Sequence, residues 1–234
     1  MRVIGIVPAR GGSKGLPGKH LRPLAGRPLI AWTFDAARAS RTLDRVILST
    51  DDDAIAEVAR EHGVDVPFMR PASLATDEAP MLDVLLHAVS ALTAAGDAPD
   101  AVVLLQPTSP LRTAAHIDEA VRLLETSGAD AVVSVVPVPH RFNPVSVMRL
   151  DGDRLVPAAD GPAVTRRQDK PLVYARNGPA VVAVRTRVLV EDRSLYGRDT
   201  RALPMSEPDS VDVDTEWDLA VAELALARRL SAAG

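Results

Sequence analysis

A glycine-rich segment near the start of the chain carries the strongest chemical signal in the sequence. It spans residues 8–20 and reads PARGGSKGLPGKH, with four glycines and the cationic side chains Arg10, Lys14 and Lys19. Glycine lets the backbone approach a ligand closely, and the cations suit a polyphosphate. Residues 1–34 contain six Lys and Arg and no Asp or Glu, although the whole chain has a net charge of −4. The segment therefore predicts a nucleotide-binding site.

Two widespread phosphate-binding loops do not fit this segment. A Walker A loop ending at Gly18-Lys19 would need glycine at position 13 and Ser or Thr at position 20, where the chain has Ser13 and His20. A dinucleotide fingerprint starting at Gly11 would also need glycine at position 13. The spacing therefore favours neither an ATPase nor a dehydrogenase. A solvated turn between strand and helix is the structural alternative, but such a turn rarely needs three cations.

A pair of carboxylates near the end of the chain could hold a metal ion. Residues 211–214 read VDVD, and alternation in an extended segment puts Asp212 and Asp214 on one face. Mg²⁺ commonly takes one or two carboxylates together with phosphate and water. The alternative is an acidic, solvated helix entrance, since Asp and Glu favour the first turn of a helix.

Polar residues follow two of the apolar runs that we interpret as strands or extended segments. Residues 106–110 read QPTSP and follow a buried run, and Arg70, Asp77 and Ala79 follow another. Ligands of open α/β sheets bind at the carboxyl edge of the strands. We therefore expect these residues to lie at the same edge as the glycine-rich segment. A turn rich in Pro, Ser and Thr is the alternative for residues 106–110.

The elements that must position these residues follow from hydrophobic periodicity. Short apolar runs predict strands or extended segments at residues 3–7, 46–48, 64–69, 101–105 and 131–136. Amphipathic spacing predicts helices at residues 29–39, 52–61, 81–92 and 115–124. Strands that alternate with helices imply an α/β fold with a mostly parallel sheet covered on both faces.

The alternation stops after residue 136. Six prolines between residues 137 and 171 exclude a long helix there. We interpret residues 138–175 as an insertion with short antiparallel strands that acts as a dimerisation arm, and the sheet as resuming at residues 180–184. Thr215 and Asp218 stand in the spacing of a capping box, which predicts a closing helix.

Composition limits the function classes. The 234 residues are consistent with a single domain spanning 1–234. The acidic net charge argues against nucleic acid as a partner, and the lack of cysteine excludes disulfides and thiolate chemistry. The first apolar run is too short for a signal peptide or a membrane span, so we expect a cytoplasmic protein that does not bind membranes.

Residues 9–19 (ARGGSKGLPGK) and 21–30 (LRPLAGRPLI) resemble the opening of the acylneuraminate cytidylyltransferases, the CMP-sialic acid synthetases and their relatives. Further segments are similar to family signatures in the same order: residues 46–51 (VILSTD), 70–77 (RPASLATD), 105–112 (LQPTSPLR) and 209–215 (DSVDVDT). The resemblance covers nearly the whole chain. It implies a Rossmann-like nucleotidyltransferase fold, Mg²⁺ as cofactor, CTP as donor, a small acidic nine-carbon sugar as acceptor, and a homodimer.

The resemblance also implies roles for particular residues. Arg10, Lys14 and Lys19 would be catalytic, and Asp212 and Asp214 would bind the metal. Nucleotide contacts would come from Ala9, Arg10, Gly11, Gly12, Ser13, Lys14, Lys19, His20, Arg70 and Ala79. Acceptor contacts would come from Gln106, Arg166, Arg176 and Asn177.

The chain departs from the family pattern at three places. His20 replaces a usual asparagine, Pro80-Met81 replaces a serine-containing stretch, and no aromatic residue follows Asn177-Gly178. CMP transfer to another anion, such as an octulosonate or a phosphonate, therefore stays open. So does a non-catalytic nucleotide-binding protein, although both Asp212 and Asp214 are present.

Overall fold

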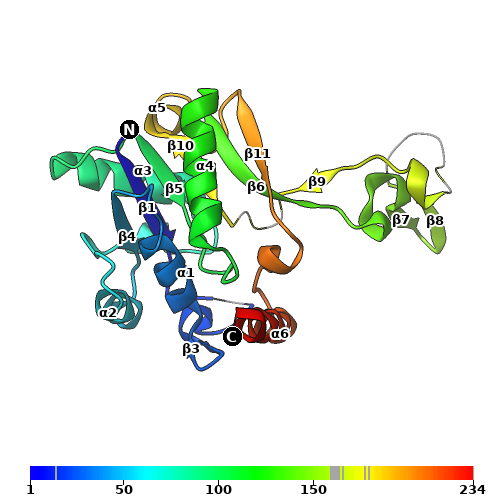
Figure 1. The fold of residues 1–234 in the computed structure, drawn as a ribbon, viewed down its shortest axis with the longest axis horizontal. Coiled ribbons are helices and arrows are strands. Elements are labelled where there is room, and N and C mark those ends of the chain that lie inside the picture. The colour runs from blue at the N-terminus through cyan, green and yellow to red at the C-terminus, as the bar shows by residue number, and fades with distance from the viewer. Residues whose placement is uncertain (14, 159–163, 165, 177, 179, 234) are drawn as a thin grey trace.

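The computed structural model describes residues 1–13, 15–158, 164, 166–176, 178 and 180–233 (Figure 1). Its centre is a sheet with the strand order β11-β6-β10-β5-β1-β4, in which β9 extends the pairing of β6. The strands are β1 (Val3–Pro8), β4 (Arg45–Ser49), β5 (Ala101–Leu104), β6 (Ala131–Pro137), β9 (Tyr174–Ala175), β10 (Val182–Arg185) and β11 (Thr200–Pro204).

Five of the six strands in this order, β11, β6, β5, β1 and β4, run in the same direction, so the sheet is mostly parallel, as the sequence predicts. β1 runs parallel to β4 and β5, and β11 runs parallel to β6. β10 lies antiparallel between β5 and β6. The stretch at 64–69, predicted as extended, makes only isolated bridges beside β4, and β11 was not anticipated from the sequence.

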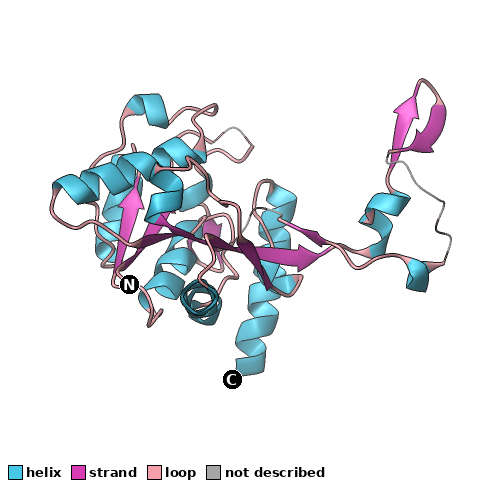
Figure 2. Ribbon diagram, turned by 90° about the horizontal axis from the view of Figure 1, so that it is seen from above, coloured by secondary structure: helices cyan, strands magenta, loops and turns pink. Residues whose placement is uncertain are grey.

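The helices lie on both faces of the sheet (Figure 2). They are α1 (Leu29–Arg38), α2 (Asp53–Glu61), α3 (Met81–Ala94), α4 (Ala114–Ser127), α5 (Thr186–Val190) and α6 (Glu216–Ala233). Alternation along β1 sends Val3 and Val7 into the core under α1, α2 and α4, and Ile4 and Ile6 into the core under α3 and α5. The predicted two-faced α/β fold is confirmed.

Short elements complete the chain. The 3-10 helices are η1 (Lys19–Leu21), η2 (Ala72–Leu74), η3 (His140–Phe142), η4 (Pro144–Ser146), η5 (Arg167–Asp169) and η6 (Pro208–Ser210). A small antiparallel pair joins β2 (Pro23–Leu24) to β3 (Arg27–Pro28). In the described part of the chain, no helix has both the length and the apolar character needed to cross a membrane.

An arm extends from the body of the protein beyond β6 and β9 (Figure 1). At its end β7 (Met148–Asp151) pairs antiparallel with β8 (Arg154–Pro157). The turn between them uses Gly152 at φ 65°, a conformation that glycine adopts without steric cost. The antiparallel strands predicted for the insertion are therefore present, and their part in dimerisation stays a prediction.

The closing helix α6 begins as predicted. Asp218 Oδ2 accepts hydrogen bonds from the Thr215 N–H at 2.9 Å and the Thr215 hydroxyl at 2.7 Å. The Asp218 N–H donates in return to Thr215 Oγ1 at 3.3 Å. The helix then packs Leu219, Ala222 and Leu226 against leucines of the N-terminal region. This packing brings the acidic segment 211–214 to the glycine-rich segment.

Candidate active site

A cavity of about 330 Å³ opens at the carboxyl ends of β1 and β5. Its lining combines cations, carboxylates and short polar side chains. The residues are Pro8, Arg10, Ser13, Lys19, His20, Arg70, Leu74, Thr76, Asp77, Ala79, Met81, Val84, Gln106, Pro107, Thr108, Asp212 and Asp214. The structure therefore collects the predicted glycine-rich, 70–79, 106–110 and 211–214 segments at one sheet edge, the position expected for ligands of α/β sheets.

Lys19 and Asp214 connect the two ends of the chain within this cavity. Gly18, at φ 63°, turns the backbone into η1, and the Lys19 side chain that follows is largely buried. Lys19 Nζ lies 2.8 Å from Asp214 Oδ1, across 195 residues of sequence. A Cβ atom at Gly15 would come within 2.9 Å of the Asp214 carbonyl oxygen. Glycine at position 15 therefore leaves room for this approach, and the positive φ at position 18 favours glycine there.

Asp212 lies deeper than Asp214. Its Oδ1 atom is buried and has no hydrogen-bond partner among the described residues. Burial raises the pKa of the Asp212 carboxyl, the charge of Asp214 adds to the rise, and a hydrogen bond from Thr108 opposes it. A Cβ atom at Gly178 would collide with the Asp212 carboxylate, so only glycine leaves room there.

These two carboxylates are the residues that could hold a divalent cation. An unpaired, buried carboxylate oxygen next to a second carboxylate is a hard donor set that Mg²⁺ favours. No cluster of three or more His, Cys, Asp and Glu suited to a metal occurs within the described ranges. A cation at this position would thus need phosphate oxygens and water for its remaining ligands.

Arg70 fixes the opposite wall of the cavity. The side chain is 6% exposed, and its Nε donates to Ser49 Oγ at 3.1 Å. Its Nη2 donates to the Ser49 carbonyl, and Nη1 donates to the Leu74 carbonyl at 3.5 Å. Burial lowers the pKa of Arg70 to about 10, which leaves it charged at neutral pH. Arg70 therefore joins the end of β4 to η2 and contributes positive charge to the cavity.

Arg10 is held by the segment that follows η2. Its Nη1 donates to the Thr76 carbonyl at 2.6 Å, and its guanidinium forms an ion pair with Asp77. Next to it, the Gly11 N–H donates to Asp51 Oδ1 at 3.1 Å. A Cβ atom at Gly11 would come within 2.5 Å of the Asp52 carboxylate. Part of the glycine-rich segment is therefore fixed by the protein's own carboxylates.

His20 is a buried histidine in the cavity wall, only 7% exposed. Burial lowers its pKa to about 4, with further lowering by the charges of Lys19, Arg70 and Arg10. Its Nδ1 atom has no hydrogen-bond partner among the described residues. At neutral pH the ring is therefore uncharged and offers one donor and one acceptor.

The remaining predicted site residues lie at different places. Gln106 lines the cavity, as does Ser13. Ala9 is buried and donates its N–H to the Ser49 carbonyl at 3.0 Å. Gly12 faces open space, because a Cβ atom there would meet nothing within 4 Å. Lys14 and Asn177 lie outside the described residues.

Two predicted acceptor-binding arginines do not line this cavity. Arg166, on the arm, pairs with Asp169 at 2.6 Å and is exposed. The Arg176 guanidinium carbon lies 4.3 Å from the ring centroid of Tyr196. Neither residue is among those that line the cavity in the described part of the chain. The structure therefore places Gln106 in the cavity wall and leaves these two arginines apart from the cavity.

Thr108 is a site residue that the sequence reasoning did not single out. Its side chain hydrogen-bonds to Asp212, and its carbonyl accepts the Val213 N–H at 2.8 Å. These contacts join the segment after β5 to the acidic segment. Its position in the sequence could have indicated this role, because Thr108 lies two residues after Gln106, in the loop that follows a buried strand.

A mostly parallel sheet with cations, glycines and paired carboxylates at its carboxyl edge is the arrangement of an α/β protein that binds phosphorylated ligands. The family model described as Cytidylyltransferase matches residues 4–187. A CMP-N,N'-diacetyllegionaminic acid synthase from Legionella pneumophila is 34% identical over 95% of this chain and 95% of its own. The Campylobacter jejuni protein of the same name is 32% identical over 92% of this chain and 91% of its own. The chain belongs to the cytidylyltransferase family.

Further similarities agree with this assignment. An N-acylneuraminate cytidylyltransferase from Streptococcus agalactiae is 36% identical over 93% of this chain and 52% of its own. A CMP:2-keto-3-deoxy-manno-octonic acid synthetase complexed with CTP superposes with a TM-score of 0.72 at 17% identity, covering 98% and 100% of the two chains. At that identity the solved structure supports the fold alone. The predicted family is therefore confirmed, and so is the prediction that the protein is an enzyme.

Proposed function

We propose that this enzyme transfers CMP from CTP to an acidic nine-carbon sugar of the sialic acid type and releases pyrophosphate. The observation that carries the proposal is the convergence of Lys19, Asp212 and Asp214 at one cavity, in a chain similar over nearly its full length to CMP-N,N'-diacetyllegionaminic acid synthases. These relatives' names specify both the CMP product and the class of acceptor.

The cavity has charges suited to a nucleoside triphosphate. Arg10, Ser13 and Lys19 would contact the phosphates, since cations and short polar groups bind phosphate oxygens. Arg70 and Ala79 lie on another part of the wall and would contact the nucleoside. His20, neutral by burial, would contact the nucleotide through hydrogen bonds rather than charge.

Asp212 and Asp214 would hold Mg²⁺, because their oxygens fit its preference for hard donors. Such a cation supplies charge neutralisation at the transferring phosphate. The protein's own contribution is to hold both carboxylates in place. Thr108 orients Asp212, and Lys19 balances the charge of Asp214.

The reaction would be a single in-line displacement. The acceptor hydroxyl oxygen forms a bond to the α-phosphorus of CTP while the bond to the bridging oxygen of pyrophosphate breaks. The hydroxyl proton passes to solvent. Catalysis would come from positioning and from stabilising charge on the phosphate oxygens, to which Arg10 and Lys19 contribute. Gln106 would orient the acceptor from the end of β5.

The proposal includes a homodimer formed through the arm. Phe142, Leu150, Leu155 and Leu172 are 58%, 73%, 64% and 72% exposed, which is unusual for large apolar side chains gathered on one projecting element. Burial of each such side chain contributes about 1.5–3 kcal/mol. A partner arm would bury them, and could bring Arg166 or Arg176 to an acceptor.

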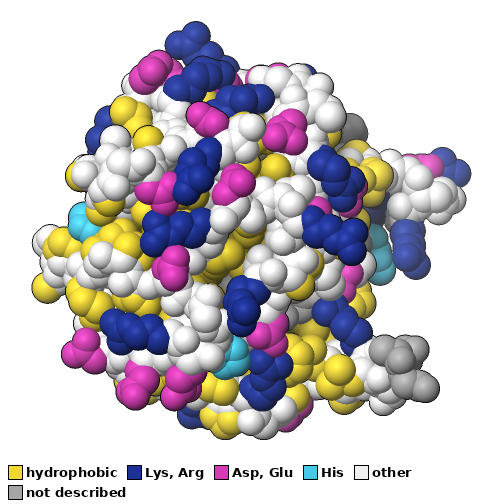
Figure 3. Space-filling view, turned by 60° about the vertical axis from the view of Figure 1, so that its left-hand side comes forward, with side chains coloured by type: hydrophobic (Ala, Val, Ile, Leu, Met, Phe, Trp, Pro, Cys, Tyr) yellow, Lys and Arg dark blue, Asp and Glu magenta, His cyan; other side chains and the backbone are white. Residues whose placement is uncertain are grey.

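The proposal also includes a cytoplasmic location without membrane or nucleic-acid partners. On the face shown in Figure 3, Lys and Arg side chains lie beside Asp and Glu rather than forming one continuous basic surface. A nucleic-acid binder usually presents a basic stripe on one face. The chain's net charge of −4 agrees with a small-molecule substrate instead.

The deciding experiment measures CTP-dependent pyrophosphate release with a panel of acceptors. The panel contains N,N'-diacetyllegionaminic acid, N-acetylneuraminic acid, 2-keto-3-deoxy-manno-octonic acid and a phosphonate. We expect one of the nine-carbon acids to give the highest kcat/KM, with Mg²⁺ required. Highest activity with the eight-carbon acid or the phosphonate would support the alternative acceptor, and no release with any acceptor would contradict the proposed function.

A further inference from the structure

Arg112 lies between β5 and α4, and its side chain is directed into the protein interior, where it is 2% exposed. Its Nη1 donates to the Gln106 carbonyl at 3.1 Å and to the Ala180 carbonyl at 2.7 Å. Its Nη2 donates to Thr33 Oγ1 at 2.7 Å. One guanidinium therefore joins three segments that are distant in sequence.

This cation is buried without a carboxylate. Burial lowers the pKa of Arg112 to about 9, so it remains charged at neutral pH. Among the described residues no acidic group pairs with it, and its Nε has no hydrogen-bond partner. Burial of a charge without a counter-charge opposes folding, so the hydrogen bonds to Gln106, Ala180 and Thr33 have to offset that cost. The guanidinium is therefore held in fixed contact with all three segments.

The acceptors of Arg112 belong to segments that build the active site. Gln106 lines the cavity. Ala180 follows Gly178, whose position is limited by the Asp212 carboxylate. The Ser109 hydroxyl adds a second connection by donating to the Gly178 carbonyl at 3.3 Å. Thr33 lies in α1, the first long helix after the glycine-rich segment.

We propose that Arg112 is a positioning residue that sets the separation between Gln106 and Ala180, and thereby where the acceptor lies relative to Asp212. The inference rests on the proposed function, since that function defines the acceptor. Arginine suits the role because its planar group directs several donors at fixed angles, whereas lysine has one nitrogen on a flexible chain.

The nucleotide side of the cavity has separate supports. Lys19 is held by Asp214 and Arg70 is held by Ser49. None of these contacts involves Arg112. Loss of Arg112 should therefore affect use of the acceptor more than binding of CTP.

Kinetics with Arg112→Lys and Arg112→Ala test this separation. With N,N'-diacetyllegionaminic acid and N-acetylneuraminic acid as probes, we expect kcat/KM for the acceptor to fall about 100-fold or more in both variants. The Kd for CTP from calorimetry should change by less than about threefold. Guanidinium ion at millimolar concentration should restore part of the turnover of Arg112→Ala and leave the wild type unchanged.

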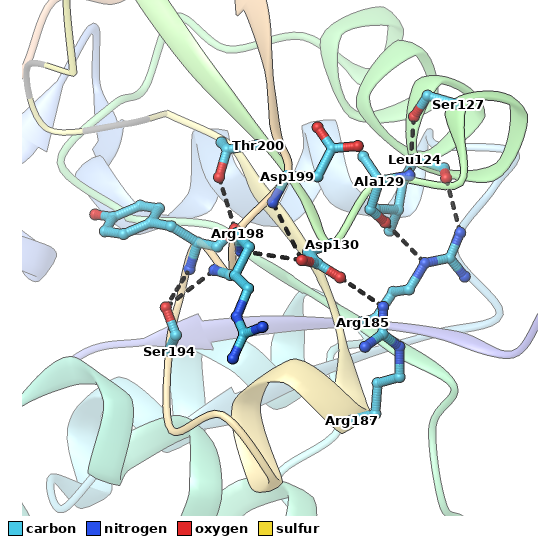
Figure 4. Close-up of polar contacts among 12 residues, drawn as sticks. Leu124, Ser127, Ala129, Asp130, Arg185, Arg187, Ser194, Arg198, Asp199 and Thr200 are labelled. Atoms are coloured by element: carbon cyan, nitrogen blue, oxygen red, sulfur yellow. Dashed lines mark hydrogen bonds and ion pairs between the residues drawn. The ribbon is translucent and has the colours of Figure 1, made fainter.

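Hydrogen exchange gives a readout that does not depend on turnover. In Arg112→Lys the amides of Thr108, Ser109 and Leu111 and those of Val181 and Val182 should exchange about tenfold faster or more. The amides of β1 and β4 should keep their rates. Arg185→Lys is the matched control. Arg185 donates to the Ala129 carbonyl at 2.8 Å and the Leu124 carbonyl at 2.9 Å, at the other end of β10 (Figure 4). It should leave acceptor kinetics unchanged.

Each outcome decides between positioning and packing. Wild-type acceptor kinetics in Arg112→Lys and Arg112→Ala would overturn the inference. Equal losses of CTP affinity, stability and acceptor use would also overturn it, because they would indicate a general packing role. If the wild type uses neither sugar, the proposed function is at fault, and unchanged exchange at both segments would then reject the role of Arg112 independently.

Discussion

Asp212 and Asp214 share one extended segment but differ in their surroundings. Asp212 has a buried, unpaired oxygen, whereas Asp214 is neutralised by Lys19 at 2.8 Å. CTP brings about four negative charges, and carboxylates beside it oppose binding unless a cation lies between them. The pair is therefore expected to be inhibitory without metal and necessary with it.

Substitution of each carboxylate by its amide separates these two effects. Asp214→Asn should bind CTP without Mg²⁺ as well as the wild type or better, because Lys19 becomes available to phosphate. Turnover with Mg²⁺ should fall by roughly two powers of ten or more in Asp212→Asn and Asp214→Asn. Calorimetry with and without Mg²⁺, beside initial rates, measures both quantities.

Asp199→Asn is the control for these variants. Asp199 pairs with Arg201 at 3.0 Å near the start of β11 and is half exposed. It should keep wild-type rates. If Asp212→Asn and Asp214→Asn also kept wild-type turnover and Mg²⁺ dependence, the acidic segment would be only the entrance to α6.

His20 gives the protein a predictable response to acid. Its pKa is about 4 in the folded protein and 6.5 in the unfolded chain, so below pH 6.5 the unfolded chain binds a proton that the folded protein does not. Stability should therefore fall as the pH drops from 6.5 to 4. The contribution reaches roughly 3 kcal/mol at the lower limit, if the other groups stay unchanged.

His20→Asn should reduce this acid sensitivity, because asparagine has no proton to gain. Urea unfolding at several pH values between 4 and 7 measures the slope. The control is His140→Asn, on the exposed surface of the arm, which should keep the wild-type slope. Identical slopes for wild type and His20→Asn would show that His20 is not the group responsible.

At the scale of elements, the first turn of α6 positions the acidic segment. Asp218 Oδ2 accepts the N–H groups of Asp214 at 3.2 Å and Thr215 at 2.9 Å. Loss of a cap costs about 0.5–2 kcal/mol. Asp218→Ala should therefore lower stability by about 1 kcal/mol and also lower turnover about tenfold, because Asp214 loses its backbone anchor.

Asp130→Ala is the matched comparison for this element. The Asp130 carboxylate also accepts two backbone N–H groups, from Arg198 at 3.0 Å and Asp199 at 3.2 Å, away from the cavity (Figure 4). Denaturant midpoints should fall in both variants, and kcat only in Asp218→Ala. A parallel loss of kcat in both would mean that general stability, rather than the α6 cap, governs turnover.

At the scale of the whole molecule, the proposed dimer depends on the arm. Leu150→Asp and Leu155→Asp place charges on the exposed apolar surface of the hairpin, where each leucine would contribute about 1.5–3 kcal/mol when covered. We expect light scattering to report a dimer for the wild type and a monomer for the double variant at micromolar concentration. Secondary structure should be unchanged outside the hairpin, because Leu150 and Leu155 are 73% and 64% exposed and pair with each other across β7 and β8.

Leu230, on α6, is also exposed, at 56%, so Leu230→Asp is the control for placing a charge at an exposed leucine outside the arm. This variant should remain dimeric. A monomeric wild type would contradict the dimer. If the wild type is a dimer, acceptor kinetics of the monomeric double variant show whether the partner arm contributes to the site. A reduced kcat/KM in a folded monomer would indicate that it does.

The sequence by itself determined the features that depend on local spacing. Alternation of apolar residues sends Ile6 and Val7 to opposite faces of β1, and the Thr215 and Asp218 spacing predicts the start of α6. Glycines and cations at residues 8–20 indicated a phosphate site because backbone access and charge are properties of the segment itself. Resemblance to a family then supplied the residue roles.

Only the tertiary structure decided which distant residues meet. Lys19 contacts Asp214 across 195 residues, Arg10 is held by Thr76 and Asp77, and Arg176 lies against Tyr196. Periodicity determines which side of an element is buried but not which neighbour covers it, because that depends on strand order and on the path of the loops. For the same reason, the family signature at residues 105–112 contains Arg112 but gives it no role until Gln106, Ala180 and Thr33 converge on its guanidinium.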